Sequence, residues 1–335
     1  MMEDRVLLAH GSGGKLSHDL IQKHFLPLFQ NPLLAKMDDA AVLELGGKFA
    51  FTTDSFVVSP IFFPGGDIGK LAVCGTVNDL AMTGAQPLYL SLSLVIEEGL
   101  PIADLQKVME SVKKAAEEAG VQIVTGDTKV VERGSADRLF LNTAGIGVVP
   151  EGVDISGSHA RPGDKVILSG GIGEHGIAVL SQREGLEFSV PIVSDCACLN
   201  KLVADMLKAS PNIHCLRDPT RGGLATTLNE LAGQSQVGIR IEEDRIPVHD
   251  AVRAACDLLG FDPLYVANEG KLVAIVPAED AEKVLAKMKR NRYGKQATII
   301  GEVVSQHPGR VVLTTRLGAS RIVDMLVGEL LPRIC

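Results

Sequence analysis

A turn-rich segment, "PEGVDISGSHARPGD" at residues 150–164, lies near the middle of this 335-residue chain. Glycine, proline, serine and aspartate concentrated in this way are typical of an exposed connection between two domains. A chain of this length is also too long for one ordinary hydrophobic core. We therefore expect one domain over residues 1–150, a second over residues 151–318, and a mobile C-terminal tail over residues 319–335.

Both halves mix strands and helices without a strict β-α-β repeat. Apolar spacing predicts strands over 50–58, 88–96, 121–127 and 139–149, and helices over 68–83 and 102–119. The second half begins as strand, glycine-rich loop and helix, followed by helices near 196–209, 222–233 and 278–290 and strands near 237–242, 271–276 and 297–304. Beyond Ala319, apolar residues from Ile322 to Leu330 suggest a short helix. The pattern favours an α+β chain of two α/β-type halves over a doubly wound sheet.

Charge and cysteine usage exclude several classes of function. The formal net charge is −8 and no basic block occurs, so nucleic acid is not an expected partner. The N-terminus lacks the apolar run of a signal peptide or membrane span, so no membrane association is expected. The six scattered cysteines suggest free thiols in a reducing compartment, and we predict a cytoplasmic protein.

Several aspartates stand beside turns or small residues in both halves of the chain. They are Asp38, Asp39, Asp54, Asp79, Asp127 and Asp218. Carboxylates of this kind suit Mg²⁺, which proteins usually hold with a few carboxylates and nucleotide phosphates. Aspartate is also a common turn and helix-cap residue, so each position taken alone has a structural alternative. Together, the aspartates favour a magnesium-nucleotide site.

A glycine loop near the N-terminus, "HGSGGK", is a candidate phosphate site. Its residues include His10, Gly11, Gly13, Gly14 and Lys15. Successive backbone N–H groups could surround a phosphate and the lysine would add positive charge. The loop is not a Walker A motif, because Ala9 and Leu16 stand where that motif requires Gly and Ser or Thr. An ordinary glycine loop remains the alternative.

Four further charged residues follow glycine and aspartate motifs: Lys129, Glu132, Arg221 and Glu269. Each could serve a reaction or form a surface ion pair.

Two other patterns favour structural roles. The glycines of "GIGEHG", residues 171–176, match GxGxxG but lack the acidic partner that dinucleotide folds place at a later strand end, so a packing turn is favoured. Cys196 and Cys198 have too few neighbouring ligands for zinc and are expected to be buried thiols.

Taken together, eight motifs carry a family resemblance: "LLAHGSGGKLSHDLI", "MDDAAVL", "TTDSFVVSP", "GTVNDLAMTGA", "TGDTKVV", "DPTRGGLA", "ANEG" and the terminal "PRIC". The chain resembles the HypE family of hydrogenase maturation proteins, which are carbamoyl dehydratases. This family belongs to the aminoimidazole ribonucleotide synthetase and selenophosphate synthetase superfamily. The likeness runs from about residue 5 to residue 335.

The resemblance implies two PurM-like α/β-type domains and a homodimer whose N-terminal domains form a shared β-barrel. ATP would bind in a cleft near the dimer interface. It also implies that Cys335 accepts a carbamoyl group from a HypF-type carbamoyltransferase. ATP-dependent dehydration would then give a thiocyanate, and the cyano group would pass to iron on a HypC–HypD scaffold for a [NiFe] hydrogenase.

The resemblance also assigns roles to individual residues. Mg²⁺ would be held by Asp39, Asp54, Asp79 and Asp218, and ATP would in addition contact His10, Gly11, Gly13, Gly14, Lys15, Asn78 and Asp127. Lys129 would stabilise phosphate charge, and Arg221 would be a further catalytic residue. Either Glu132 or Glu269 would be the general base, and the sequence does not choose between them.

Two alternatives remain open at this point. Another ATP-using member of the superfamily, such as selenophosphate synthetase, would need a cysteine near its N-terminus, whereas the first cysteine here is Cys74. A non-catalytic thiol carrier or metal-delivery scaffold would use Cys335 but would leave the aspartates without a role.

Overall fold

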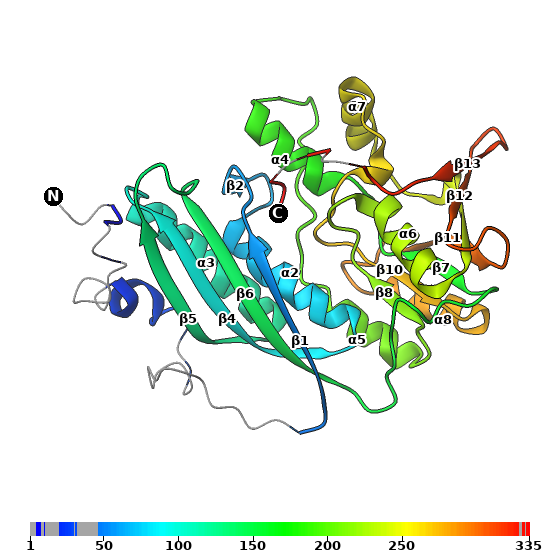
Figure 1. The fold of residues 1–335 in the computed structure, drawn as a ribbon, viewed down its shortest axis with the longest axis horizontal. Coiled ribbons are helices and arrows are strands. Elements are labelled where there is room, and N and C mark those ends of the chain that lie inside the picture. The colour runs from blue at the N-terminus through cyan, green and yellow to red at the C-terminus, as the bar shows by residue number, and fades with distance from the viewer. Residues whose placement is uncertain are drawn as a thin grey trace.

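A computed structural model describes residues 5–7, 10, 20–29, 31, 46–327, 330–331 and 333–335. Two bodies of mixed helix and sheet lie side by side, and the C-terminus lies between them (Figure 1). Within the described residues, no helix is both long enough and apolar enough to cross a membrane.

A four-stranded sheet forms the centre of the N-terminal domain. Its order is β1 (Lys48–Phe56), β6 (Leu139–Val149), β4 (Gln86–Glu97) and β5 (Gln122–Val131). Only the β4–β5 pair is parallel. In β6 every second residue is buried, which is the pattern of a strand with one face on a core. Among the described residues, this half also contains the short strands β2 (Phe62–Phe63) and β3 (Gly66–Asp67) and the π-helix η2 (Ile21–Phe25).

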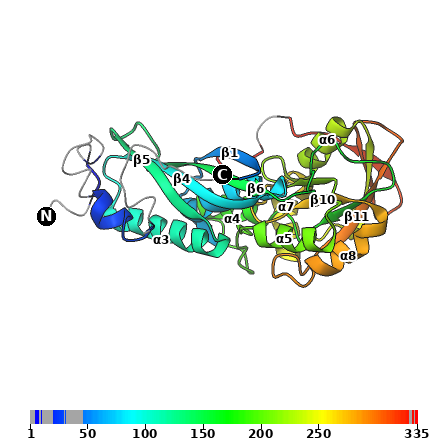
Figure 2. The same cartoon turned by 90° about the horizontal axis from the view of Figure 1, so that it is seen from below.

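Helices α2 (Ile68–Met82) and α3 (Ile102–Ala119) cover one face of this sheet (Figure 1), and Figure 2 shows α3 along that face. Helix α2 is apolar on nearly every side, because it lies between the sheet, α3 and the C-terminal domain. It begins at Asp67, whose carboxylate accepts hydrogen bonds from the Gly69 and Lys70 N–H groups at 2.8 and 3.0 Å. Helix α3 ends at Gly120, with the left-handed φ of 80° expected at that position.

The opposite face of the N-terminal sheet is exposed in the described structure. Phe51 is 70 % exposed, Phe49 44 % and Val95 36 %. Phe49 and Phe51 lie together on β1, whereas Val95 lies toward the other end of the same face on β4, opposite Phe140 of β6. A monomer seldom exposes apolar side chains of this size together, so this face requires an explanation.

The C-terminal domain is built on a seven-stranded sheet. Its order is β13 (Ser320–Val323), β12 (Val311–Thr314), β9 (Gly238–Glu242), β11 (Thr298–Val304), β7 (Lys165–Leu168), β10 (Val273–Val276) and β8 (Cys215–Arg217). Helix α6 (Gly223–Ser235) packs on one face, and α5 (Asn200–Ala209) and α8 (Ala278–Met288) pack on the other. Strand β7 shows the division, because Val166 and Leu168 face α6 while Ile167 faces α5 and α8. Helices α4 (Glu174–Glu184) and α7 (Asp250–Leu259) pack together and, with the 3₁₀ turns η4 (Glu243–Arg245) and η5 (Pro263–Tyr265), complete this half.

The α+β architecture is confirmed, but one predicted element is wrong. The expected helix after Ala319 is strand β13, which pairs antiparallel with β12 through Val323 opposite Val311. Val323 is buried whereas its neighbour Ile322 is 56 % exposed, as expected for adjacent strand residues that point to opposite faces of a sheet. Helix α7 was not predicted.

Candidate functional site

The terminal tail lies along the chain that continues from β1. The N–H groups of Val57 and Ser59 donate to the main-chain oxygen of Cys335 and to the Arg333 carbonyl, both at 3.2 Å. These alternate contacts run antiparallel, as in the addition of a strand to a sheet edge. The Ile334 side chain is only 2 % exposed and belongs to the core of the N-terminal domain. The structure thus shows a docked tail, while the predicted mobility stays a prediction.

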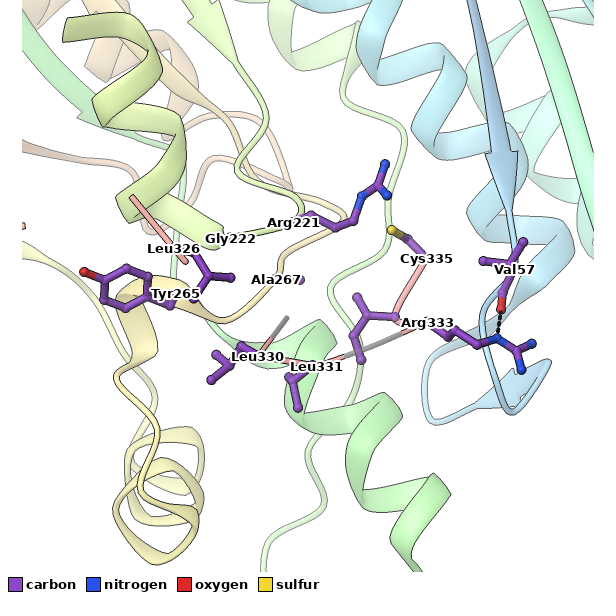
Figure 3. A pocket seen from close by; sticks show the side chains of 11 residues that line it. Val57, Arg221, Gly222, Tyr265, Ala267, Leu326, Leu330, Leu331, Arg333 and Cys335 are labelled. Atoms are coloured by element: carbon purple, nitrogen blue, oxygen red, sulfur yellow. Dashed lines mark hydrogen bonds between the residues drawn. The ribbon is translucent and has the colours of Figure 1, made fainter. Parts of the chain in front are cut away.

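The Cys335 thiol borders a cavity of about 400 Å³ between the two domains, and the Arg221 guanidinium extends toward the sulfur (Figure 3). Val57, Tyr265, Ala267 and Leu331 also line the cavity. Burial raises the pKa of the thiol to about 12, aided by the negative charges of Glu269 and Asp54 and opposed by Arg221. The docked thiol is therefore protonated at neutral pH.

Glu269 lies in the segment that precedes β10, close enough to the Cys335 thiol for its charge to help raise the pKa of that thiol. Its side chain is buried, and its Oε1 has no hydrogen-bond partner among the described residues. Burial, followed by the neighbouring Cys196 and Asp218, raises the pKa of this carboxyl well above its usual value. Ala267, two residues earlier, lines the cavity, and an unpartnered buried carboxyl so close to it is a candidate proton acceptor for a group carried on Cys335.

Three aspartates gather beside this corner: Asp54 from β1, Asp79 from α2 and Asp218 after β8. Burial raises the pKa of all three carboxyls, and the negative neighbours Asp79 and Asp54 contribute to raising that of Asp218 to about 7. Thr52 fixes Asp79 through a hydroxyl hydrogen bond of 3.0 Å. In the parts of the chain that are described, these side chains do not by themselves form a cluster that could hold a metal ion. Their mutual repulsion nevertheless suits a cation that takes its remaining ligands from phosphates.

Asp218 and Arg221 are placed by a tight loop that runs into α6. Gly222 and Gly223 adopt left-handed φ angles of 75° and 60°. A Cβ atom at Gly223 would lie 2.6 Å from the Leu264 carbonyl oxygen, so only glycine fits there. The "DPTRGG" motif therefore has a structural reason for its glycines and a chemical one for Asp218 and Arg221.

The candidates on β5 lie elsewhere in the chain. Lys129 and Asp127 form an exposed ion pair of 2.6 Å, and Glu132 is exposed just beyond the strand. Strands β1 and β5 are opposite edges of the sheet, with β6 and β4 between them. Three strand spacings amount to ~14 Å. One copy of the chain therefore brings Glu269 to Cys335 but leaves Lys129, Asp127 and Glu132 apart from it.

The remaining candidates have mixed outcomes. Asn78 is buried, and its amide donates to the Ala197 carbonyl at 3.0 Å and accepts from the Leu199 N–H at 2.8 Å, so it fastens α2 to the second domain. His10 accepts a hydrogen bond from the Leu7 N–H through Nδ1 at 2.9 Å. The loop glycines Gly11, Gly13 and Gly14, together with Lys15, Asp38 and Asp39, lie outside the described residues.

The glycine motif at residues 171–176 and the pair Cys196 and Cys198 have packing roles. A Cβ atom at Gly176 would lie 2.5 Å from the Val266 side chain, so this glycine permits close packing of α4. Cys196 and Cys198 are buried thiols, and the Cys198 sulfur lies 3.1 Å from that of Cys74.

Sequence reasoning missed the residues that hold the tail, notably His175, Arg183 and Asp137. The Arg333 guanidinium donates to Asp137 at 2.6 Å, and Arg183 donates to the Arg333 carbonyl at 2.7 Å. The one available signal was that His175 stands inside the glycine motif at residues 171–176.

Comparisons with known proteins agree with this geometry. The family model of the AIR synthase related protein N-terminal domain matches residues 37–149, and that of the C-terminal domain matches residues 161–314. Carbamoyl dehydratase HypE of Azotobacter vinelandii is 56 % identical over 331 residues, which are 98 % of this chain and 97 % of that protein. A solved structure of hydrogenase maturation protein HypE in complex with ATP is 53 % identical with a TM-score of 0.95, covering 98 % of this chain and 99 % of that one. A HypE–HypF complex structure superposes with a TM-score of 0.82 at 53 % identity, covering 92 % of this chain and 99 % of that one.

Proposed function

The chain belongs to the HypE family of carbamoyl dehydratases, and from this membership we propose that it dehydrates a carbamoyl group carried on its own Cys335. ATP drives the reaction, and the product is an S-bound cyano group, a thiocyanate. That group supplies the cyanide ligands of the iron in a [NiFe] hydrogenase. The observation that carries the proposal is the terminal thiol docked beside Glu269, Arg221 and the aspartates.

The chemistry accounts for these residue types. The oxygen of an S-carboxamide is a poor leaving group, but transfer of the γ-phosphoryl group from ATP to this oxygen, with release of ADP, allows it to leave as phosphate. Loss of phosphate and of the amide protons then leaves a C≡N triple bond on sulfur, with ADP and phosphate released. The protein must therefore bind ATP, hold the carboxamide oxygen in line with the phosphoryl group, and accept protons from nitrogen.

Glu269 is the general base in this proposal. Its carboxyl neighbours the thiol that carries the amide, whereas Glu132 lies beyond the opposite edge of the sheet. A carboxyl with a raised pKa also binds a proton more strongly than an ordinary glutamate. Glu269 can accept a proton from the amide nitrogen only in its carboxylate form, and positive charge bound near Glu269 would favour that form.

Asp54, Asp79 and Asp218 hold Mg²⁺ together with the nucleotide phosphates. Burial raises the pKa of each carboxyl although Arg217 and Arg221 oppose the shift, and a divalent cation bound here would favour the ionised carboxylates. Asp39 belongs to this set by sequence. Arg221, which extends toward Cys335, balances negative charge that develops on the transferred phosphoryl group.

The active form is a homodimer joined through the exposed face of the N-terminal sheet. Pairing β1 with the partner's β5 at both seams closes two four-stranded sheets into one barrel and covers Phe49, Phe51 and Val95. That pairing carries Lys129 and Asp127 toward the partner's tail site. Lys129 then binds phosphate across the interface, and Glu132 has no catalytic role.

The cycle requires the tail to leave its dock and visit other proteins. A HypF-type carbamoyltransferase loads Cys335, and a HypC–HypD iron scaffold receives the cyano group. All six cysteines are free thiols in the structure, which is compatible with the reducing cytoplasm where we place this cycle.

The test is mass spectrometry of the C-terminal peptide. Cyanate carbamoylates thiols chemically, so Cys335 can be loaded without the partner enzyme. Loaded protein is given Mg-ATP and cleaved after Glu329, and the peptide "LLPRIC" is weighed. Loss of one water only in the presence of ATP is the expected result. An unchanged carbamoyl group on folded protein that binds ATP would overturn the proposal and favour a carrier without dehydratase activity.

A further inference from the structure

Helix α4 begins next to the docked tail and contacts it at two carbonyls. The His175 Nε2 atom lies 2.9 Å from the Ile334 carbonyl oxygen. Two turns later, Arg183 reaches the Arg333 carbonyl through Nη2 at 2.7 Å and the Ser59 carbonyl through Nε at 2.8 Å. Helix α4 thus contacts the two peptide groups that precede Cys335.

The tautomer of His175 follows from these contacts. A carbonyl oxygen only accepts, so Nε2 carries the hydrogen and donates it to Ile334. Nδ1 lies 2.8 Å from the Ser194 hydroxyl, which donates to it and accepts from the Cys196 N–H at 3.1 Å. Complete burial lowers the pKa of His175, which keeps the imidazole neutral and this arrangement intact.

The same contacts lead to Glu269. Asp195 lies between Ser194 and Cys196, and its two carboxylate oxygens accept the N–H groups of Glu269 and Gly270, both at 3.1 Å. Lys271 donates to the same carboxylate at 3.0 Å. The segment that His175 fixes through Ser194 therefore also fixes the backbone of Glu269.

We propose that His175 is a positioning residue for the tail: its Nε2–H holds the Ile334 carbonyl, Arg183 holds the next one, and together they place the Cys335 sulfur opposite Glu269. The role of Cys335 as carrier of the carbamoyl group rests on the proposed function, but the docking of the tail does not. Replacement of the histidine lets the tail undock more often, which exposes a thiol that is otherwise protonated and half-buried. A lost hydrogen bond to a buried carbonyl corresponds to about a tenfold shift in the docking equilibrium.

The experiment measures iodoacetamide alkylation of Cys335 in the intact protein by mass spectrometry, without ATP or a carbamoyl group. His175→Asn keeps an amide near Ser194 but falls short of Ile334, whereas His175→Gln places an amide N–H where Nε2 stands. We expect about tenfold faster alkylation of Cys335 in His175→Asn and a near-native rate in His175→Gln. Arg183→Gln is expected to accelerate alkylation as well. His159→Gln, at a histidine of the same domain remote from the tail, is the matched control.

The five buried cysteines report folding in the same spectrum, because they are labelled only if the protein opens. Equal acceleration in His175→Asn and His175→Gln would overturn the role of the Nε2 donor. Unchanged rates in both His175→Asn and Arg183→Gln would overturn the docking function of α4. If His175→Asn labels all six cysteines, Arg183→Gln decides alone. Since no dehydration is measured, failure here is distinguishable from failure of the proposed function.

Discussion

At the β1 edge of the N-terminal sheet, the terminal cysteine is docked and half-buried near Asp54 and Glu269, carboxyls whose pKa values are raised by burial. At the β5 edge, Lys129 and Asp127 pair with each other in solvent and contact no part of that corner. One chain therefore assembles the thiol side of the proposed site and leaves the phosphate-binding lysine outside it. The difference indicates that Lys129 at the β5 edge binds phosphate only when a partner chain pairs with that edge.

Replacement of the thiol should have the largest effect. Cys335→Ala is expected to abolish formation of the cyano group completely, because no other exposed thiol can carry the carbamoyl group. The main-chain oxygen of residue 335 that accepts from the Val57 N–H is retained in this variant, so the fold and ATP binding should persist. Peptide mass spectrometry and calorimetric ATP titration check both parts. A variant that fails to fold or to bind ATP would contradict the carrier assignment.

Assigning the general base tests this comparison directly, because Glu269 lies near the docked tail and Glu132 lies beyond the end of β5. Glu269→Gln should lower the dehydration rate at least a hundredfold, because a general base contributes roughly 10²–10⁴. Glu132→Gln is the matched control and should stay close to the native rate. Single-turnover assays on cyanate-loaded protein measure both. A large loss in the Glu132 variant with a small loss in the Glu269 variant would reverse the assignment.

The thiol pKa predicts how pH releases the tail. The pKa is about 12 when docked and roughly 8.5 for an ordinary cysteine. Because docking raises the thiol pKa, the protonated thiol stabilises the docked tail fully below about pH 8.5. This stabilisation is lost as the pH rises toward 12. Between pH 8.5 and 10, Cys335 alkylation should therefore rise more than tenfold, whereas a free "LLPRIC" peptide should level off. Matching profiles for protein and peptide would show that the tail is not docked in solution.

The same contrast explains what the sequence could predict. Alternating Leu90, Leu92 and Leu94 indicated β4, and the glycines after Asp218 indicated the loop that places Arg221, because these signals are local. The docking of Ile334 against His175 joins residues 159 positions apart, and no local pattern encodes it. The segment after Ala319 looked helical because its strand pairing depends on β12, a partner that apolar spacing alone does not reveal.

The smallest expected signal tests whether Lys129 acts across the interface. Lys129→Ala alone should lose most dehydration, and Cys335→Ala loses all of it. If each site combines one chain's Cys335 with the partner's Lys129, a mixed dimer of the two variants contains one intact site. Random exchange makes half of the dimers mixed, so activity should return to about a quarter of the native value. If Lys129 instead serves its own chain's Cys335, no dimer in the mixture has an intact site, and the mixture should show no more activity than Lys129→Ala alone. That result would place the lysine's role on the sheet edge of its own chain, against the present geometry, in which β6 and β4 separate it from the tail.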